Sequence, residues 1–256
     1  MPIKEKDLEG KIAIVTGSAG LLGKYFIKCL AENGATVIAA DYNEEKCVLQ
    51  CNELGHSNIH PIFIDVTDPK SIEKTFSDVE SRFGLPQILV NGAYKHTSIS
   101  YEMRSAEEFE SILRVNLSGV FYCCQTAGRF MKKAGGGSII NIGSIYGIVS
   151  ADPRLYGTSG LNSPDVYAAS KGGVIQLTRY LAVHMAKDNI RVNSISPGGI
   201  YNNQEPGFVE RYNQKVPLGR MAKAEELCGP LLFLATTASS YVTGHNLVVD
   251  GGFTIW

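Results

Sequence analysis

The chain has 256 residues, of which 44% are hydrophobic and 19% charged, and its formal net charge is −1. An apolar fraction this high excludes an intrinsically disordered chain, and the lack of a basic excess argues against a general nucleic-acid-binding protein. No apolar run is long enough to cross a membrane, so the sequence predicts a cytoplasmic protein with a single domain over residues 1–256.

Short apolar runs alternate with longer helical segments along the chain. The predicted strands are residues 11–16, 35–41, 59–65, 88–91, 138–142, 190–196 and 247–249. The predicted helices are residues 21–33, 44–54, about 68–83, about 106–133 and about 166–186. Because the strands are almost continuously apolar, we expect an α/β fold with a doubly wound, seven-stranded parallel sheet and helices on both faces. Such a sheet binds ligands beyond the carboxyl ends of its strands.

A glycine-rich turn, GSAGLLG from Gly17 to Gly23, directly follows the first predicted strand. Glycines at this place let backbone N–H groups and the start of a helix approach a pyrophosphate closely. A tight turn with a purely structural role is the alternative. The residues predicted to lie beside the phosphates are Gly17, Ala19, Gly20, Leu21 and Leu22.

Asp41 ends the second predicted strand, 24 positions after Gly17. A carboxylate at this place accepts hydrogen bonds from the adenosine ribose hydroxyls and would repel the 2′-phosphate of NADP. No arginine follows it directly, because the next residues are Tyr42 and Asn43. The sequence therefore predicts NAD in preference to NADP, with a solvated loop carboxylate as the alternative.

Tyr167 and Lys171 are four positions apart in a predicted helix, which places both side chains on one face. A tyrosine with its ordinary pKa of about 10 is a poor acid or base near neutral pH. A lysine ammonium beside it favours the phenolate, so we expect a lowered pKa of Tyr167 and proton transfer by the pair. Alone, such a pair is common on helix surfaces.

With these motifs, the chain resembles the short-chain dehydrogenase/reductase family nearly from end to end, from Gly10 to Gly252. The resemblance implies a single-domain Rossmann fold and hydride transfer between a nicotinamide and an alcohol or carbonyl carbon. The segment from Pro217 to Gly252 is similar to the family's C-terminal signature. The family's catalytic tetrad is matched by Asn116, Ser144, Tyr167 and Lys171.

The resemblance assigns a role to each of the four. Tyr167 would be the general acid/base, and Ser144 would hydrogen-bond the reacting oxygen. Lys171 would bind the nicotinamide ribose and tune Tyr167, and Asn116 would support a water-mediated proton path to Lys171. Adenine would lie by Asp65 and Val66. The other cofactor contacts that the resemblance implies are Tyr42, Asn91, Gly92, Ala93, Tyr167, Lys171, Pro197, Gly198, Ile200 and Asn202.

Three departures from the family pattern bear on the site. Leu21 stands where the family usually has its middle glycine, and the resulting spacing is similar to that of longer sugar-nucleotide-modifying relatives. Tyr94 replaces a small residue beside the cofactor. Ser144 and Tyr167 are 23 positions apart, farther than is usual, and the loop-like insertion, about residues 149–162, would overhang the substrate. The alternative is that the insertion is a surface loop without a function.

Residues 200–216, where the family has its substrate lid, are polar and amide-rich, unlike the apolar helix that a steroid or long acyl chain needs. Cations for a phosphate or carboxylate are available from Lys95, His96, Arg154, Arg211 and Lys215. We therefore expect a polar, sugar-like alcohol or ketone, or an anionic derivative of one, and a role in carbohydrate modification. The candidate substrate residues are Tyr94, Lys95, His96, Arg154 and Tyr156.

Two other functions stay open: a non-redox epimerase or dehydratase of a nucleotide sugar, and a catalytically silent NAD-binding regulatory protein. The complete tetrad argues against the second. Cys47, Cys51, His56 and His60 are spaced as zinc ligands could be, but the helical spacing of the cysteines favours core packing, and we predict no metal site. The resemblance also implies a homo-oligomer, a tetramer or a dimer, paired through residues 106–133 and 166–186.

Overall fold

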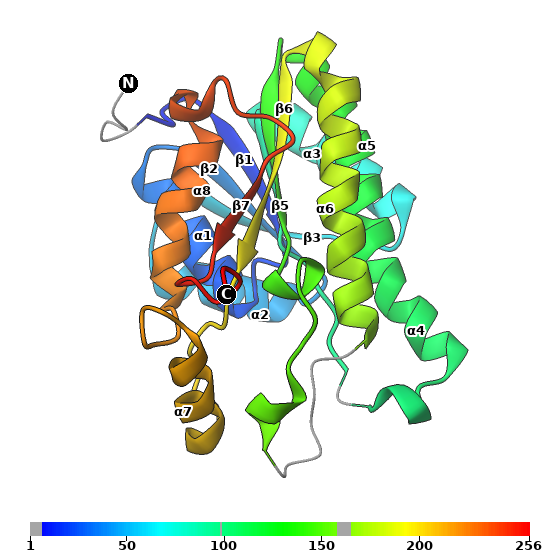
Figure 1. The fold of residues 1–256 in the computed structure, drawn as a ribbon. Helices are drawn as coiled ribbons and strands as arrows, with labels where there is room; N and C mark the ends of the chain where they lie inside the picture. Colours follow the sequence, from blue (N-terminus) through cyan, green and yellow to red (C-terminus); the bar gives the residue numbers. More distant parts are fainter. Residues whose placement is uncertain (1–6, 98, 158–164) are drawn as a thin grey trace.

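A computed structural model describes residues 7–97, 99–157 and 165–256. Within them, seven strands form one parallel sheet in the order β3-β2-β1-β4-β5-β6-β7 (Figure 1). The predicted parallel sheet is confirmed, and its order reverses between β1 and β4, where a crevice opens at the carboxyl ends. The strands are β1 Ile12–Thr16, β2 Thr36–Asp41, β3 Ile59–Phe63, β4 Ile88–Asn91, β5 Gly137–Ile142, β6 Ile190–Pro197 and β7 Asn246–Val249.

Helices cover both faces of the sheet. They are α1 Leu21–Glu32, α2 Glu44–Leu54, α3 Pro69–Phe83, α4 Ala106–Leu113, α5 Gly119–Lys133, α6 Asp165–Met185, α7 Pro206–Lys215 and α8 Cys228–Ala235. Apolar residues of α1, α2 and α8 pack on one face, and those of α3, α5 and α6 pack on the other. Figure 1 shows α1 and α8 on one side of the strands and α5 and α6 on the opposite side. In the described part of the chain, no helix combines the length and apolarity needed to cross a membrane.

Most predicted boundaries agree with the structure to within one residue, but two elements differ by more. The single helix predicted over residues 106–133 is divided by a π-helical turn, Arg114–Ser118, which separates α4 from α5. Asn116 in this turn is fully buried, because its amide is bonded to the chain that leaves β4. Strand β3 ends at Phe63, two residues before the predicted end, because the backbone N–H of Asp65 donates to Ser71 Oγ of α3 instead of extending the ladder.

A third, smaller apolar cluster lies beyond the carboxyl edge of the sheet. It joins segments that are far apart in sequence, with Leu155 from the predicted insertion, Tyr212 of α7, Val216 directly after α7, and Phe253 near the end of the chain. In Figure 1, α7 and the 3₁₀ turn Pro153–Tyr156 both project past the carboxyl ends of the strands. The predicted insertion and lid therefore pack against each other; residues 158–162 of the insertion lie outside the described residues.

Candidate active site

A cavity of 810 Å³ opens at the carboxyl ends of the strands. One part is formed by the glycine turn and Asp41, and another by Ser144, Tyr167 and side chains of α7. The structure thus brings most of the predicted cofactor residues together around one space. Those that line it are Gly17, Ala19, Gly20, Leu21, Leu22, Asp41, Gly92, Tyr167, Lys171, Pro197, Gly198, Ile200 and Asn202.

The remaining predicted cofactor residues, Tyr42, Asp65, Val66, Asn91 and Ala93, are not among the lining residues of this cavity. Asp65 accepts hydrogen bonds from the backbone and hydroxyl of Thr67 at 2.8 and 2.7 Å. Asn91 Nδ2 donates to Asn141 Oδ1 at 2.8 Å and links β4 to β5. Asn91 Oδ1 is buried and has no partner among the described residues.

The glycine turn approaches its neighbours too closely for side chains. Gly17 has φ +71°, and a Cβ there would lie 2.6 Å from the backbone of Ala93. A Cβ on Gly23 would lie 2.3 Å from the carbonyl oxygen of Gly17. Gly20 caps α1 without a side-chain hydrogen bond, so the N–H groups at the start of the helix carry no internal side-chain cap. This cradle fits a pyrophosphate despite Leu21 in the middle position.

Asp41 is fixed by two backbone hydrogen bonds at the end of β2. Its Oδ2 accepts from Ala19 N at 2.9 Å, and its Oδ1 accepts from Asn43 N at 2.9 Å. The carboxylate is thereby attached to the glycine turn itself, where it lines the cavity beside Asn43 and Lys46. A ribose next to the phosphates would meet this carboxylate, which could accept hydrogen bonds from its hydroxyls.

Ser144, Tyr167 and Lys171 meet at the end of β5. Ser144 begins the 3₁₀ turn after the strand, and its hydroxyl is hydrogen-bonded to the phenol of Tyr167. Lys171, one turn along α6, places Nζ 5.7 Å from the centre of the Tyr167 ring and donates to Ile142 O at 2.6 Å. Three of the four predicted catalytic residues therefore face one another.

Burial governs the protonation of this group. It raises the pKa of Tyr167, and the hydrogen bond from Ser144 lowers it by less. Burial also lowers the pKa of Lys171 to about 8. The predicted lowering of the Tyr167 pKa by Lys171 was therefore wrong for this structure, because desolvation of the phenolate outweighs the favourable contacts.

Asn116 binds the chain after β4, and among the described residues no hydrogen bond joins it to Lys171. Its Oδ1 accepts from Lys95 N at 2.7 Å, and its Nδ2 donates to Lys95 O at 3.1 Å and to Ser170 Oγ at 3.4 Å. The π-helical turn carries the amide into this position. Asn116 thus fastens the segment that holds Tyr94 and His96 to α6.

Aromatic side chains dominate the substrate part of the cavity. The predicted Tyr94, His96 and Tyr156 line it, and Tyr146, Phe208 and Tyr212 join them. Sequence reasoning missed the last three, as well as Gln204. A signal for Phe208 and Tyr212 was present in their spacing of four within the lid, which puts both on one face of α7. The lid is therefore polar outward but aromatic toward the cavity.

Of the five predicted cations, all of which the structure describes, His96 lines the cavity and the other four do not. Lys95 Nζ donates to Ser111 Oγ, and Arg154, which is 87% exposed, is paired with Asp152. Lys215 is bound to the same Asp152 at 3.0 Å, and Arg211 donates to the carbonyl oxygen of Leu155 at 2.8 Å. Asp152 and Leu155 are on the insertion, so Lys215 and Arg211 of the lid hold these two segments together instead of facing the cavity.

A buried arginine was also missed. The side chain of Arg104 is 2% exposed and its Nε donates to Asp165 Oδ1 at 2.9 Å, at the start of α6. The same guanidinium donates to Thr97 Oγ1 at 3.3 Å and to Ile99 O at 2.5 Å. Arg104 therefore anchors the chain after β4 at a second point. No sequence motif marks it.

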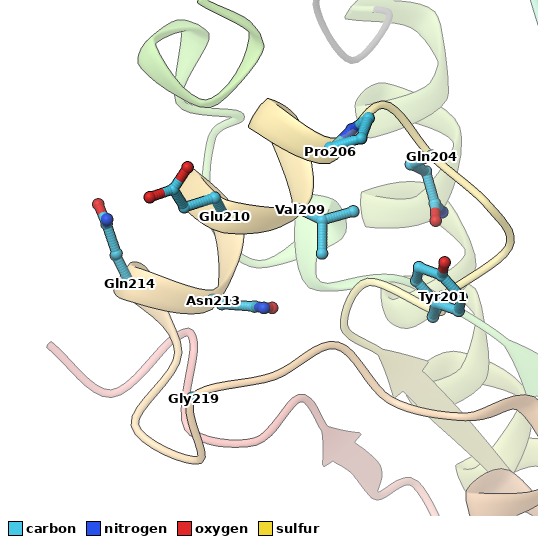
Figure 2. Close-up of a pocket in the computed structure, with 8 residues that line it drawn as sticks. All are labelled: Tyr201, Gln204, Pro206, Val209, Glu210, Asn213, Gln214 and Gly219. Atoms are coloured by element: carbon cyan, nitrogen blue, oxygen red, sulfur yellow. The ribbon is translucent and has the colours of Figure 1, made fainter.

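The outer side of the lid carries a second, more open pocket of 550 Å³ (Figure 2). It lies between α7 and the loop before it, and Gln204 lines both this pocket and the main cavity. Figure 2 shows Val209 and Asn213 of α7 directed toward this space. Tetrad residues are absent from its lining.

Cys47 and Cys51 lie in the core on the α2 side of the sheet, where Cys47 Sγ donates to Ala39 O at 3.2 Å. His60 stacks on Phe83, with ring centroids 4.5 Å apart. Among the described residues, no three His, Cys, Asp or Glu side chains are grouped as a metal site would need. The cysteines therefore serve packing in this structure.

Comparison with known proteins finds relatives that match almost the whole length of the chain. A family model described as "Enoyl-(Acyl carrier protein) reductase" matches residues 19–254. The chain is 36% identical over 254 residues to the 3-oxoacyl-[acyl-carrier-protein] reductase FabG of Thermotoga maritima, covering 97% of this chain and 99% of that protein. It is 36% identical over 273 residues to a D-arabinitol 2-dehydrogenase [ribulose-forming] of Scheffersomyces stipitis, with 97% and 95% covered. A short-chain dehydrogenase structure from Leptospira borgpetersenii with bound NAD⁺ has a TM-score of 0.90 at 38% identity and covers 99% and 97% of the two chains.

Proposed function

The chain belongs to the short-chain dehydrogenase/reductase family, and from this premise we propose that it is an NAD-dependent dehydrogenase that oxidises a secondary alcohol of a neutral polyol to the ketone. That it is an NAD(P)-dependent enzyme acting on alcohols or ketones follows from the family. The preference for NAD and the polyol are our proposals.

The observation that carries the proposal is the contact of Ser144 with Tyr167 in a cavity that also contains the glycine turn and Asp41. When bound, NAD would supply the hydride acceptor. Gly17, Gly20 and the start of α1 would hold its pyrophosphate, and Asp41 its adenosine ribose. Lys171 would bind the ribose next to the nicotinamide.

The chemistry of the chain's own residues is a proton transfer. Ser144 Oγ would hold the substrate oxygen while Tyr167 Oη takes its proton, so that a ketone is left when hydride leaves the same carbon. In the reverse direction Tyr167 returns the proton. Lys171 favours the phenolate by its charge, and the carbonyl of Ile142 keeps its ammonium in place.

The lining of the substrate part supports a neutral, hydroxylated substrate. It offers phenol, imidazole and amide groups from Tyr94, His96, Tyr156 and Gln204. Apart from His96, the cations considered for an anionic substrate are bound to residues of the insertion or to Ser111. The D-arabinitol 2-dehydrogenase relative acts on a sugar alcohol, which supports the same class.

The test is formation of NADH by the purified protein with NAD and a panel of tetritols, pentitols, hexitols, sugar phosphates and nucleotide sugars. We expect activity with one or more neutral polyols and its loss, by roughly a hundredfold or more, in Tyr167→Phe. Tyr241→Phe is the matched control, since Tyr241 is fully exposed. Turnover of an acyl thioester or a sugar phosphate alone would contradict the substrate class.

The same panel separates the two other functions. Product formed from a nucleotide sugar without net NADH would indicate an epimerase or dehydratase. A rise in melting temperature with NAD but no turnover of any compound would indicate an NAD-binding regulatory protein.

We also infer a homo-oligomer paired through α5 and α6, in a cytoplasmic setting. Tyr180 and Val183 on α6 are 59% and 76% exposed, and apolar surface of this kind supports a protein interface. Light scattering coupled to gel filtration tests this, and a monomer would contradict it. The six thiols, all within the described residues, are free, which supports a reducing compartment.

A further inference from the structure

We propose that the described part of the insertion, residues 149–157, is a specificity element: Tyr156, together with Tyr146, binds hydroxyl groups of the polyol remote from the oxidised carbon, and Asp152 positions Tyr156 by fastening this segment to α7. This inference rests on the proposed function, and it assigns to the insertion a role in choosing the substrate.

The two tyrosines form one wall of the main cavity. Both line it, and their hydroxyls are hydrogen-bonded to each other. Tyr146 also lies close enough to Tyr167 and Tyr212 for their charges to affect its pKa, so this wall is near the catalytic tyrosine. Tyr146 follows Ser144 by two residues, whereas Tyr156 comes from the insertion.

The chemistry of this wall suits neighbouring hydroxyl groups. A phenol both donates and accepts, and two adjacent phenols can exchange their mutual bond for bonds to two hydroxyls of one chain. The rings of Phe208 and Tyr212 adjoin them, with Tyr156 and Phe208 centroids 5.1 Å apart. Such apolar faces contact the C–H groups of a polyol. A monohydroxy alcohol has no second hydroxyl group for the phenol pair to bind.

The insertion is held against the lid by contacts that lie outside the cavity. Asp152 Oδ2 accepts from Lys215 Nζ at the end of α7 at 3.0 Å, and Asp152 Oδ1 accepts from Arg154 N at 3.1 Å, which closes the turn leading to Tyr156. The side chain of Asp152 is only 10% exposed. Arg211 donates to the carbonyl oxygen of Leu155, whose side chain is buried in the cluster shared with α7.

These contacts give Asp152 the role of a positioning residue. Arg154 and Lys215 hold the pKa of its carboxyl well below the ordinary value, so it is ionised at every working pH. Lys215 is fixed in turn, because Trp256 Nε1 donates to its carbonyl oxygen at 2.9 Å and its ammonium lies 4.9 Å from the ring centre of Phe253. Loss of the carboxylate would loosen Tyr156 without touching the tetrad.

The first experiment compares a hexitol with 2-hexanol, which has a secondary alcohol but lacks the remote hydroxyls. In Tyr156→Phe we expect kcat/KM for the hexitol to fall about three- to tenfold and that for 2-hexanol to stay unchanged. Tyr241→Phe is the control. An equal fall for both alcohols, or none for either, would overturn the inference while leaving the polyol function in place. A wild-type enzyme that oxidises no polyol would overturn both.

The second experiment tests the positioning role. Asp152→Asn should raise KM for the hexitol by about fivefold with kcat and the Kd of NAD little changed, and Asp152→Asn/Lys215→Met should be no worse than the single variants. Asp152→Glu should recover part of the loss. Asp188→Asn is the matched control, because Asp188 forms a similar pair with Lys132, at 2.9 Å, on α5. An unchanged KM, or a fall in kcat with KM unchanged, would refute the role of Asp152.

Discussion

Lys171 Nζ donates to the carbonyl oxygen of Ile142 at 2.6 Å, which anchors a buried ammonium at the end of β5, two residues before Ser144. The bond explains how the lysine is held beside Tyr167. It also means that the folded chain carries a charged group where burial disfavours charge, and this has a measurable consequence for stability.

The protein without cofactor should become more stable between pH 8 and 10.5 through Lys171. The folded pKa is about 8 and the ordinary value is 10.5, so in this window the unfolded chain binds the proton that the folded chain has lost. The gain is up to about 3 kcal/mol. Urea unfolding of wild type and Lys171→Met across this range checks it. A difference between the two that stays constant with pH would contradict the burial of a titrating lysine.

Alcohol oxidation should follow the ionisation of Tyr167. Because burial raises its pKa, kcat/KM should increase with pH on the alkaline side of neutrality. Ser144→Ala removes the hydrogen bond that lowers this pKa, so the ascending limb should move to higher pH as well as lose amplitude. A profile of kcat/KM against pH for both proteins measures the shift. An ascending limb at the same pH in both proteins would mean that Ser144 does not affect the pKa of Tyr167.

Asp41→Ser should move the cofactor preference toward NADP by about tenfold or more, because it removes the charge that repels a 2′-phosphate. Lys46 lines the same part of the cavity and would then face the phosphate, so adding Lys46→Met should reverse much of the change. The ratio of kcat/KM for the two cofactors is the measurement, with the exposed Glu45→Gln as control. An unchanged ratio of kcat/KM for the two cofactors would show that Asp41 does not determine the cofactor preference.

Asn116→Leu should lower the free energy of unfolding by roughly 2 to 4 kcal/mol, because it removes the buried amide and two partly buried hydrogen bonds with the backbone of Lys95. Activity should fall as well, since the segment carrying Tyr94 is released. Denaturant unfolding and NADH formation measure the two effects. Asn52→Leu, at an exposed position of α2, is the control, and equal stability of the two variants would contradict the role of Asn116.

Two glycine substitutions should have different effects. Gly17→Ala places a Cβ 2.6 Å from Ala93 at φ +71°, so we expect loss of NAD binding and a lower melting temperature. Gly229→Ala in α8 meets no other segment within 4 Å but precedes Pro230, so it should leave NAD binding unchanged and bring no gain in stability. Thermal unfolding with and without NAD distinguishes them. A Gly17→Ala protein with normal NAD binding would be evidence against the close turn.

The alternation of apolar runs and helical segments was sufficient to predict the parallel sheet, and the spacing of Tyr167 and Lys171 was sufficient to place both on one helix face. These are local properties, because the period of the side chains follows from backbone geometry alone. The glycine turn and Asp41 could likewise be assigned to the carboxyl edge, since each directly follows a strand.

Other features depended on contacts between distant segments. The sequence offers Lys215 and Arg154 as free cations, but the tertiary structure pairs both with Asp152, and it places Phe208 and Tyr212 on the inner side of a lid that looks polar. The pKa of Tyr167 is another case, because burial is a property of the whole packed molecule and here it raises the pKa by more than the hydrogen bond from Ser144 lowers it. The sequence by itself therefore determined the parallel sheet, the glycine turn and the pairing of Tyr167 with Lys171 on one helix face, because these follow from short-range periodicity. The packing of the insertion against α7 decided which cations are free and which aromatic rings face the substrate part of the cavity, because both depend on contacts between distant segments.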